Sequence, residues 1–468
     1  MIDTAAIKNK VLAFAFQGKL VEQTNENAQE LLSRVCNERD VLIKQKLIKK
    51  SKTKPIADDD KMYQIPANWI WVRLGDVINL QSGQDLATSD YNDQALGVPY
   101  ITGASNFRSD ESLIINRWTE TPKAIALEND ILLSVKGTVG KLAFLHEDKV
   151  HIARQIMGIR PIGLNRKYVK YFVQEQVEEL KAISKGLIPG IERDNVLNML
   201  MPLPPLNEQE MIVEKIEEAF AQIDIIDVMQ LKYSSDLEVL KSKIIDAGIQ
   251  GKLTEQLPED GTAEDLLEQI AEEKKQLVKE KKIKATKAFP EITEDEIPFE
   301  IPDNWKWVRI QELIEKDLGG GTPSKAVSEY WDNGNIPWAS VKDFSAAEGG
   351  YLVDTIDHIT QEGLENSSAN LADEKSIVIC MRMGLGKIAR VAKPMAINQD
   401  LRAIWLNKAV LEDYFVLFYS TLRIEGRGMT VAGIRKDELM SMVFPLPSIS
   451  EQKRIVEKIQ QVMSSIYC

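Results

Sequence analysis

The most regular pattern in the chain is a run of apolar side chains between Asn207 and Gly251. They recur at steps of three or four residues, at Ile212, Ile216, Ala219, Ile223, Ile226, Met229, Tyr233, Leu237, Leu240 and Ile244. The steps average about 3.5 residues, the period of a coiled-coil seam. Asn207 with Glu210 fits a capping box, and Gly251 is placed to end the helix. The pattern predicts one helix of about 43 residues, roughly 65 Å long.

Both ends of the chain repeat parts of this pattern. The N-terminal residues match the second half of the central run, and the C-terminal residues match its first half. The seam positions predicted there are Ile7, Val11, Phe14, Ile455, Ile459, Val462 and Ile466. Because a lone amphipathic helix cannot bury its apolar side, we expect the two termini to lie end to end and antiparallel to the central helix. Two unrelated helices on separate cores are the alternative.

Longer repeats indicate that the chain is a tandem duplication. PLPPLNEQEMIVEKI, which begins at Pro202, returns as PLPSISEQKRIVEKI from Pro445. QGKLVEQ returns as QGKLTEQ, and IPANWIWVRL returns as IPDNWKWVRI. The copies differ by small loop insertions.

Two related globular segments lie between the helices, at 61–205 and 297–447. Their short apolar runs, broken by Gly, Pro, Asn and Asp and joined by one or two helices, predict an α+β fold class. The long helices between these two homologous domains would form an antiparallel coiled coil. The other predicted segments are an N-terminal helix at 1–22, an amphipathic helix with a basic linker at 23–60, a central helical region at 206–254, a second amphipathic helix with its linker at 255–296, and a C-terminal helix at 448–468.

Composition narrows the class of protein. The chain has 468 residues, 44% hydrophobic and 28% charged, as expected of a globular protein with several domains. No apolar run reaches the roughly 18 residues of a membrane span, and Lys8 and Lys10 interrupt the apolar N-terminus, so we expect neither a span nor a signal peptide. Three distant cysteines without CxxC spacing favour the cytoplasm over a disulfide or zinc framework. The net charge of −13 does not by itself indicate a nucleic-acid binder.

Catalytic motifs are scarce. His146, His151 and His358 lack metal-ligand spacing and are predicted to be surface or hydrogen-bonding residues. GTVGK and GLGK resemble the end of a phosphate-binding loop, but Leu142 and Ile388 stand where a Mg²⁺-binding hydroxyl is needed. A tight turn between strands is the better interpretation, so we expect a non-catalytic chain without a metal. An NTPase remains an alternative.

Polar side chains gather at Gly-rich turns, at matching places in both globular segments. Hydroxyl, amide and basic groups of this kind reach phosphates and base edges. The candidate DNA-binding residues are Gln81, Gln84, Thr102, Ser105, Asn106, Arg108, Lys136, Thr138, Lys141, Arg154, Gln155, Thr322, Ser324, Lys325, Ser340, Lys342, Arg382, Lys387, Asn398, Gln399, Arg402, Arg427 and Arg435. Polar residues fill turns in any protein, so the recurrence supports the set and not its single members.

The order of helix, domain, long helix, domain and terminal helix resembles the specificity (S) subunit of Type I restriction–modification systems over essentially the whole chain. The motifs that carry the resemblance are PLPPLNEQ…IVEKI with PLPSISEQ…IVEKI, IPxNWxWVR, GGGTPSK…EYW…IPWASVKDF and NQDLRAI. The resemblance implies that each domain recognises one half of a split double-stranded DNA target. It also implies that the coiled coil sets the half-site spacing and docks two modification (methyltransferase) subunits.

The resemblance assigns the chemistry to partners. S-adenosylmethionine would be bound by the methyltransferase subunits, and ATP with Mg²⁺ would be used by restriction (translocase–nuclease) subunits. This chain would bind none of these cofactors. A coiled-coil scaffold with two protein-binding domains is the remaining alternative.

Overall fold

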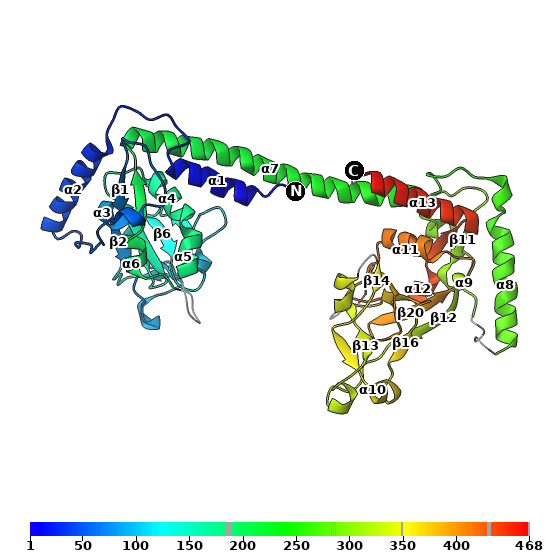
Figure 1. The fold of residues 1–468 in the computed structure, drawn as a ribbon. Coiled ribbons are helices and arrows are strands. Elements are labelled where there is room, and N and C mark those ends of the chain that lie inside the picture. Colours follow the sequence, from blue (N-terminus) through cyan, green and yellow to red (C-terminus); the bar gives the residue numbers. More distant parts are fainter. Residues whose placement is uncertain are drawn as a thin grey trace. The chain divides into compact units, whose positions relative to one another are not determined.

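The computed structural model describes residues 1–183, 190–281, 283, 285, 287–347, 350–427 and 432–466. Its contacts divide the chain into two compact units, Met1–Lys232 and Tyr233–Cys468. Figure 1 shows helices and strands in each unit, with the boundary inside the long helix α7 (Leu206–Ile249).

The first unit combines helices with short strands. Its α-helices before α7 are α1 (Thr4–Phe16), α2 (Ala28–Lys44), α3 (Leu74–Val77), α4 (Arg166–Glu175), α5 (Val177–Ile183) and α6 (Arg193–Leu197). Its strands are β1 (Ile70–Arg73), β2 (Ile78–Ser82), β3 (Val98–Ile101), β4 (Trp118–Thr119), β5 (Ile125–Leu127), β6 (Ile131–Ser134), β7 (Leu142–Phe144), β8 (Lys149–Ile152), β9 (Ile156–Pro161) and β10 (Leu200–Leu203). They form the sheets β2-β9-β6-β7 and β4-β3-β8-β5 and the pair β1-β10.

The second unit has the same kinds of element. Its α-helices after α7 are α8 (Ala263–Lys279), α9 (Ile310–Leu313), α10 (Gln361–Glu365), α11 (Glu412–Thr421), α12 (Lys436–Ser441) and α13 (Ile449–Ile466). Its strands are β11 (Lys306–Arg309), β12 (Ile314–Gly319), β13 (Ile336–Ala339), β14 (Tyr351–Leu352), β15 (Asp357–Ile359), β16 (Asn370–Ala372), β17 (Ile377–Cys380), β18 (Ile388–Val391), β19 (Met395–Ile397), β20 (Leu401–Leu406) and β21 (Val443–Leu446).

The two units share one topology. The sheet β12-β20-β17-β18 repeats β2-β9-β6-β7, β15-β13-β19-β16 repeats β4-β3-β8-β5, and β11-β21 repeats β1-β10. The second unit adds β14, which pairs in parallel with β18. The central strands β6 and β17 are buried at every residue, as expected for strands covered on both faces. The predicted tandem repeat of α+β domains with a long helix between them is confirmed.

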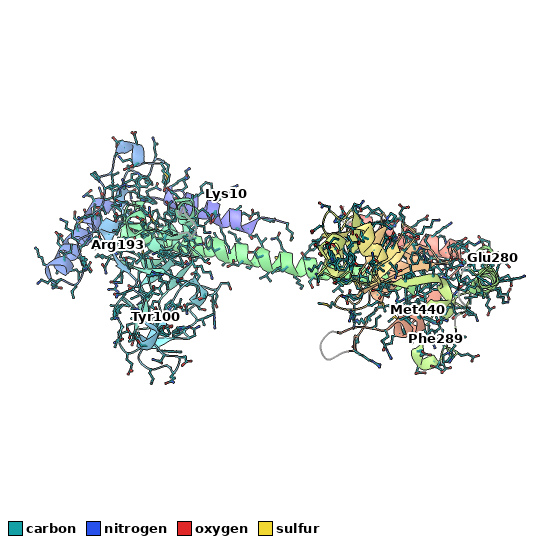
Figure 2. The ribbon with its side chains drawn as sticks, turned by 90° about the horizontal axis from the view of Figure 1, so that it is seen from below. Lys10, Tyr100, Arg193, Glu280, Phe289 and Met440 are labelled. Atoms are coloured by element: carbon teal, nitrogen blue, oxygen red, sulfur yellow. The ribbon has the colours of Figure 1, made fainter. Side chains whose placement is uncertain are left out.

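In the first unit, α1 lies antiparallel to α7. Thr4 Oγ1 donates to Asp227 Oδ1 at 2.6 Å, and Lys8 Nζ lies 2.5 Å from Asp224 Oδ1. The residue numbers of the contacting residues therefore decrease along α7 as they increase along α1. Lys10 is on the exposed side of α1 (Figure 2). The apolar residues that α1 and α7 share with the domain core are Leu12, Ala15, Phe16, Ile212, Val213 and Ile216.

In the second unit, α13 lies antiparallel to the last part of α7. Thr254 Oγ1, which follows α7, donates to Glu451 Oε1 at 3.2 Å near the start of α13. Further along α13, Ile459 covers Gly248, where a Cβ would lie 2.6 Å from the isoleucine Cδ1. Only a residue without a side chain allows this close approach of the two helices.

Burial varies among the predicted seam positions. The buried or half-buried members are Ile7, Val11, Ile212, Ile216, Ile223, Ile226, Leu237, Ile244, Ile455, Ile459, Val462 and Ile466. The prediction is wrong for Phe14, Met229, Tyr233 and Leu240, which are 48%, 64%, 62% and 45% exposed. Tyr233 lies beyond the part of α7 that α1 covers, because α1 begins at Thr4, which contacts Asp227. Phe14 lies two positions from both Leu12 and Phe16, which are buried in the core, so its side chain is on the opposite side of α1. Helix α7 also begins at Leu206, so the predicted cap Asn207 lies inside its first turn.

A buried carboxyl group joins three chain segments of the first unit. Glu208, in the first turn of α7, has no exposed surface. Its Oε1 accepts from Thr24 N, Thr24 Oγ1 and Asn68 Nδ2, each at 2.7 Å, and its Oε2 accepts from Trp69 Nε1 at 2.5 Å. The first turn of α7, the segment after α1 and the residues before β1 are thereby held together.

Glu451 has the same role in the second unit. It is also fully buried, and its Oε2 accepts from Trp305 Nε1 at 2.9 Å. The glutamine that follows each glutamate is buried too: Gln209 Oε1 accepts from Asn165 N at 2.9 Å, and Gln452 Oε1 accepts from Leu411 N at 2.7 Å. The repeated Glu-Gln dipeptide therefore binds the helix start to its own domain.

Glu208→Ala should lower the free energy of unfolding of the first unit by on the order of 3 kcal/mol, because it removes the acceptor of the buried Trp69 indole and of three donors on the half-buried Thr24 and Asn68. Urea unfolding followed by tryptophan fluorescence measures the change. The exposed Glu210→Ala on the same helix is the control and should stay within about 0.5 kcal/mol of the wild type. Equal free energies of unfolding in the two variants would contradict a structural role for Glu208.

Candidate nucleic-acid interface

Four loops meet at one edge of the first domain. Gln84 N donates to Ile152 O at 2.9 Å, and Val135 N donates to Gln155 O at 2.8 Å. A Cβ on Gly103 would lie 2.5 Å from Gln155 Oε1, so this loop touches the same place. The loops that meet are 83–85, 102–108, 136–141 and 153–155.

The second domain builds the same cluster. Gly321 N donates to Ile397 O at 2.9 Å, and Met381 N donates to Asp400 O at 2.7 Å. Ile434 N adds a hydrogen bond to Met381 O at 2.9 Å. The described loops that meet here are 320–325, 340–342, 382–387, 398–400 and 432–435.

These hydrogen bonds align the two clusters residue by residue. Lys136 and Arg382 occupy one shared position, and Lys141 and Lys387 occupy another. The glycine before each lysine has a positive φ, of 90° and 84° respectively. GTVGK joins the antiparallel strands β6 and β7, and GLGK joins β17 and β18, so both stretches are turns between strands.

Most of the predicted DNA-binding residues are exposed on these loops. The exposed ones are Gln84, Ser105, Arg108, Lys136, Thr138, Lys141, Arg154, Gln155, Ser324, Lys325, Lys342, Arg382, Lys387, Gln399, Arg427 and Arg435. The half-buried ones are Gln81, Thr102, Thr322, Ser340 and Arg402. Within each domain the structure thus places side chains from distant parts of the sequence on one surface.

The prediction is wrong for Asn106, which is only 1% exposed. Its Oδ1 accepts from Thr102 N, Thr102 Oγ1 and Gly103 N at 3.0 to 3.1 Å, and its Nδ2 donates to Ile114 O at 2.7 Å. The side chain closes its own loop and has no group left to meet a base.

The predictions for Asn398 and Ser340 are also corrected, because hydrogen bonds within their own loops hold both side chains. Asn398 is 6% exposed, and its Oδ1 accepts from Asp400 N at 3.0 Å. Ser340 donates from both N and Oγ to Asp343 Oδ2, at 2.7 and 2.9 Å. Both side chains shape the loops that carry the exposed groups.

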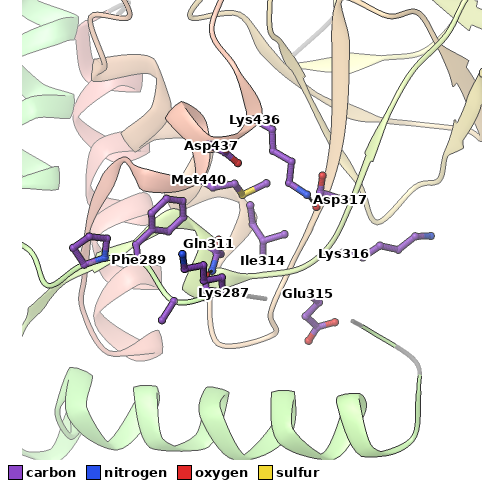
Figure 3. A pocket seen from close by; sticks show the side chains of 12 residues that line it. Lys287, Phe289, Gln311, Ile314, Glu315, Lys316, Asp317, Lys436, Asp437 and Met440 are labelled. Atoms are coloured by element: carbon purple, nitrogen blue, oxygen red, sulfur yellow. Dashed lines mark hydrogen bonds and ion pairs between the residues drawn. The ribbon is translucent and has the colours of Figure 1, made fainter. Parts of the chain in front are cut away.

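Arg402 is corrected as well, because it pairs with Asp317 inside the second domain. Asp317 Oδ1 also lies 2.8 Å from Lys436 Nζ, on the wall of a cavity of about 430 Å³ formed by β12, α12 and residues 287–290. Figure 3 shows Lys436 reaching toward Asp317 across this wall. The single carboxylate of Asp317 thus contacts two basic groups, and it holds the guanidinium of Arg402 inside the domain, where the side chain is 19% exposed.

Sequence reasoning missed two carboxylates of these loops. Asp85 Oδ2 lies 2.7 Å from Arg154 Nε, and Asp400 Oδ1 lies 2.6 Å from Arg382 Nη2. Aspartates are not among the groups that attract phosphate, because their carboxylates are negatively charged, so the pattern of candidate residues did not include them. The available signal was an aspartate in GQD and in NQD, directly beside candidate residues in both domains.

His151 is a buried hydrogen-bonding residue beneath the first cluster. Its Nδ1 accepts from Lys123 N and Ala124 N, each at 3.1 Å, and its Nε2 donates to Gln84 O at 2.8 Å. The ring of Tyr100, labelled in Figure 2, lies 4.9 Å from the imidazole. Burial lowers the pKa of His151, because the cation would lose both solvation and its acceptor role.

Among the residues that the structure describes, no three His, Cys, Asp or Glu side chains are grouped to hold a metal ion. Of the helices described, none is long and apolar enough to cross a membrane.

The fold defines a class of tandem-repeat proteins in which two domains of one topology share a long helix and expose matching loop clusters. Residues 66–231 and 302–467 each match the family described as the Type I restriction modification DNA specificity domain. The chain therefore belongs to this family of Type I restriction–modification specificity subunits.

Individual relatives are similar over different lengths. The Type I restriction enzyme EcoAI specificity subunit of Escherichia coli is 24% identical, across 98% of this chain and 89% of that protein. The EcoR124I/EcoR124II specificity subunit of Escherichia coli is 39% identical over 163 residues, which are 32% of this chain and 39% of that protein. A solved structure, titled for complex assembly and conformational transition of the type I R-M system, has the same fold, with a TM-score of 0.59, 19% identity and coverage of 86% of this chain and 92% of that one.

The first unit should lose stability as the pH falls below about 6.5, because the unfolded chain then protonates His151 while the folded chain, with its lowered pKa, resists. The contribution of the neutral imidazole is complete above the unfolded pKa and is lost as the pH falls toward the folded one. Thermal unfolding of the first unit between pH 7.5 and 5 measures the effect.

His151→Phe should flatten this pH dependence and cost about 1–3 kcal/mol at pH 7.5 through its unpaired backbone donors. His146→Gln, at an exposed position, is the control and should keep the wild-type profile. An unchanged slope in His151→Phe would show that another group titrates.

Proposed function

We propose that this specificity subunit reads a bipartite, asymmetric target on double-stranded DNA, one half with each domain. The observation that carries the proposal is that one loop cluster is built twice, at equivalent places, with different side chains. Lys136 stands where the other domain has Arg382, and Arg154 stands where it has Gln399. Two loop clusters with the same backbone structure fit the same geometry of the DNA backbone, whereas different polar side chains on them select different bases.

The length of α7 supports a role in half-site spacing. The helix has 44 residues without a break, which corresponds to about 66 Å. One turn of DNA is roughly 34–36 Å long. We propose that this helix, with α1 along its first part and α13 along its last part, sets the separation of the half-sites.

Exposed apolar side chains on α7 support docking of modification subunits. Ile225, Val228 and Met229, in the part of α7 that belongs to the first unit, are 51%, 65% and 64% exposed. Val228 and Met229 lie three and four residues after Ile225, so both are its neighbours on the helix surface. Ile225 lies two residues from both Ile223, which is buried, and Asp227, which contacts α1, so this face points away from α1.

The chemistry of the system is proposed to lie in partner subunits. The modification subunits would bind S-adenosylmethionine and methylate the DNA, and the restriction subunits would use ATP and Mg²⁺. This chain would select the DNA sequence, and the complex would act in the cytoplasm. A chain with a net charge of −13 fits such a complex, because its partners can supply the phosphate contacts that dominate affinity.

Replacing residues 66–205 with the matching segment of another family member should change one half of the methylated sequence and leave the other half and the spacer unchanged. Methylation sequencing of a genome that carries the full set of subunits measures this. Replacement of 302–447 is the reciprocal control. Changes in both halves, or in neither, would contradict domain-wise reading.

Ile225→Asp with Met229→Asp should weaken co-purification of the modification subunit by at least tenfold, because two charges would be buried in the proposed contact. Val41→Asp with Leu47→Asp, at two other exposed apolar positions of the same unit, is the matched control and should not change co-purification. Thermal unfolding of both variants checks that the chain remains folded. Equal recovery of the partner with both variants would exclude this face of α7.

A further inference from the structure

One close backbone contact, present in both loop clusters, establishes which residue of the first domain corresponds to which residue of the second. In the first domain, a Cβ on Gly83 would lie 2.0 Å from Ala153 O, so the two loops touch through their backbones. In the second domain, a Cβ on Gly320 would lie 2.1 Å from Asn398 O. The two contacts are therefore the same feature of the shared fold.

One pair of facing side chains follows from this alignment. Two residues after the glycine stands Asp85 in the first domain and Thr322 in the second. One residue after the contacted carbonyl stands Arg154 in the first domain and Gln399 in the second. The pair Asp85–Arg154 thus occupies the position of the pair Thr322–Gln399, and both pairs are in contact.

Asp85 holds Arg154 in a defined orientation. One carboxylate oxygen accepts from Arg154 N at 3.1 Å, and the other lies 2.7 Å from Arg154 Nε. The arginine side chain is 68% exposed. Because the aspartate contacts Nε, the fork formed by Nη1 and Nη2 on this exposed side chain is left for a ligand. Such a fork matches the O6 and N7 acceptors of guanine.

Thr322 holds Gln399 in the second domain. The hydroxyl Oγ1 donates to Gln399 Oε1, which fixes the orientation of the amide. Gln399 is exposed and Thr322 is half-buried. The amide keeps its Nε2 donors and a second lone pair on Oε1, which match the N7 acceptor and the N6 donor of adenine.

We propose that this shared position reads one base pair in each half-site: Arg154, oriented by Asp85, reads guanine, and Gln399, oriented by Thr322, reads adenine. The proposal rests on the proposed function and names the base that each domain selects at this position. A stabilising role explains the pairs less well, because an exposed ion pair contributes little to stability and the second domain has no charge at this position.

The test exchanges the two pairs in the full chain, expressed with its modification subunits and followed by methylation sequencing. Asp85→Thr with Arg154→Gln should change one guanine of the first half-site to adenine. Thr322→Asp with Gln399→Arg should change one adenine of the second half-site to guanine. Each change should alter the preference between the two bases by on the order of tenfold to a hundredfold, with the other half-site unaffected.

Two further variants separate base reading from charge. Arg154→Lys keeps the charge and loses the fork, so it should relax the sequence preference at the guanine alone. Arg108→Gln, on the same exposed edge, should lower methylation equally at all sites without changing the motif. Thermal unfolding of each variant verifies that the first unit is folded.

Loss of methylation at all sites alike in the Arg154→Lys variant, or an unchanged motif in both exchanged variants, would overturn the assignment of bases. These results would leave the bipartite target of the wild type intact. A wild-type motif without two separated halves would instead overturn the proposed function, and the base assignment with it.

Discussion

A buried carboxyl group at the start of a helix holds each unit in its arrangement. Glu208 accepts four hydrogen bonds from two other segments of the first unit, Thr24 after α1 and Asn68–Trp69 before β1. An unsatisfied polar group at such a depth is costly, and a satisfied network is rigid. The direction in which α7 leaves the domain is therefore fixed by chemistry as well as by apolar packing.

In the first unit, the helices and the residues that anchor them to the domain form a structural frame, which is distinct from the polar loops. The carboxyl cluster, the β1-β10 pair and the contacts of α1 with α7 lie in one continuous core, and the polar loops follow the strands β2, β3, β6 and β8 of the two four-stranded sheets. Tyr168 adds a further tie on the frame side, since its hydroxyl donates to Pro202 O at 2.7 Å, as Tyr414 does to Pro445 O at 3.1 Å. Loop side chains can therefore change without disturbing the frame.

The frame could be predicted from the sequence because repetition and periodicity report directly on packing. The loop surface could be predicted only as a set. Asn106 has the chemistry of a base-reading residue but is buried, because it closes its own turn. Phe14 has seam spacing but is exposed, because it lies two positions from both Leu12 and Phe16, whose side chains are buried in the core. Asp85 repels phosphate and gains its importance only through contact with Arg154.

Internal pairing of charges also explains how an acidic chain can select DNA. Arg154, Arg382 and Arg402 each contact an aspartate of their own domain. Such pairing reduces the attraction to phosphate that every DNA sequence offers equally. It also orients the free ends of exposed guanidinium groups, and oriented donors distinguish base edges. The pairing thus reduces the general attraction to phosphate and keeps the oriented donors on which discrimination between base edges depends.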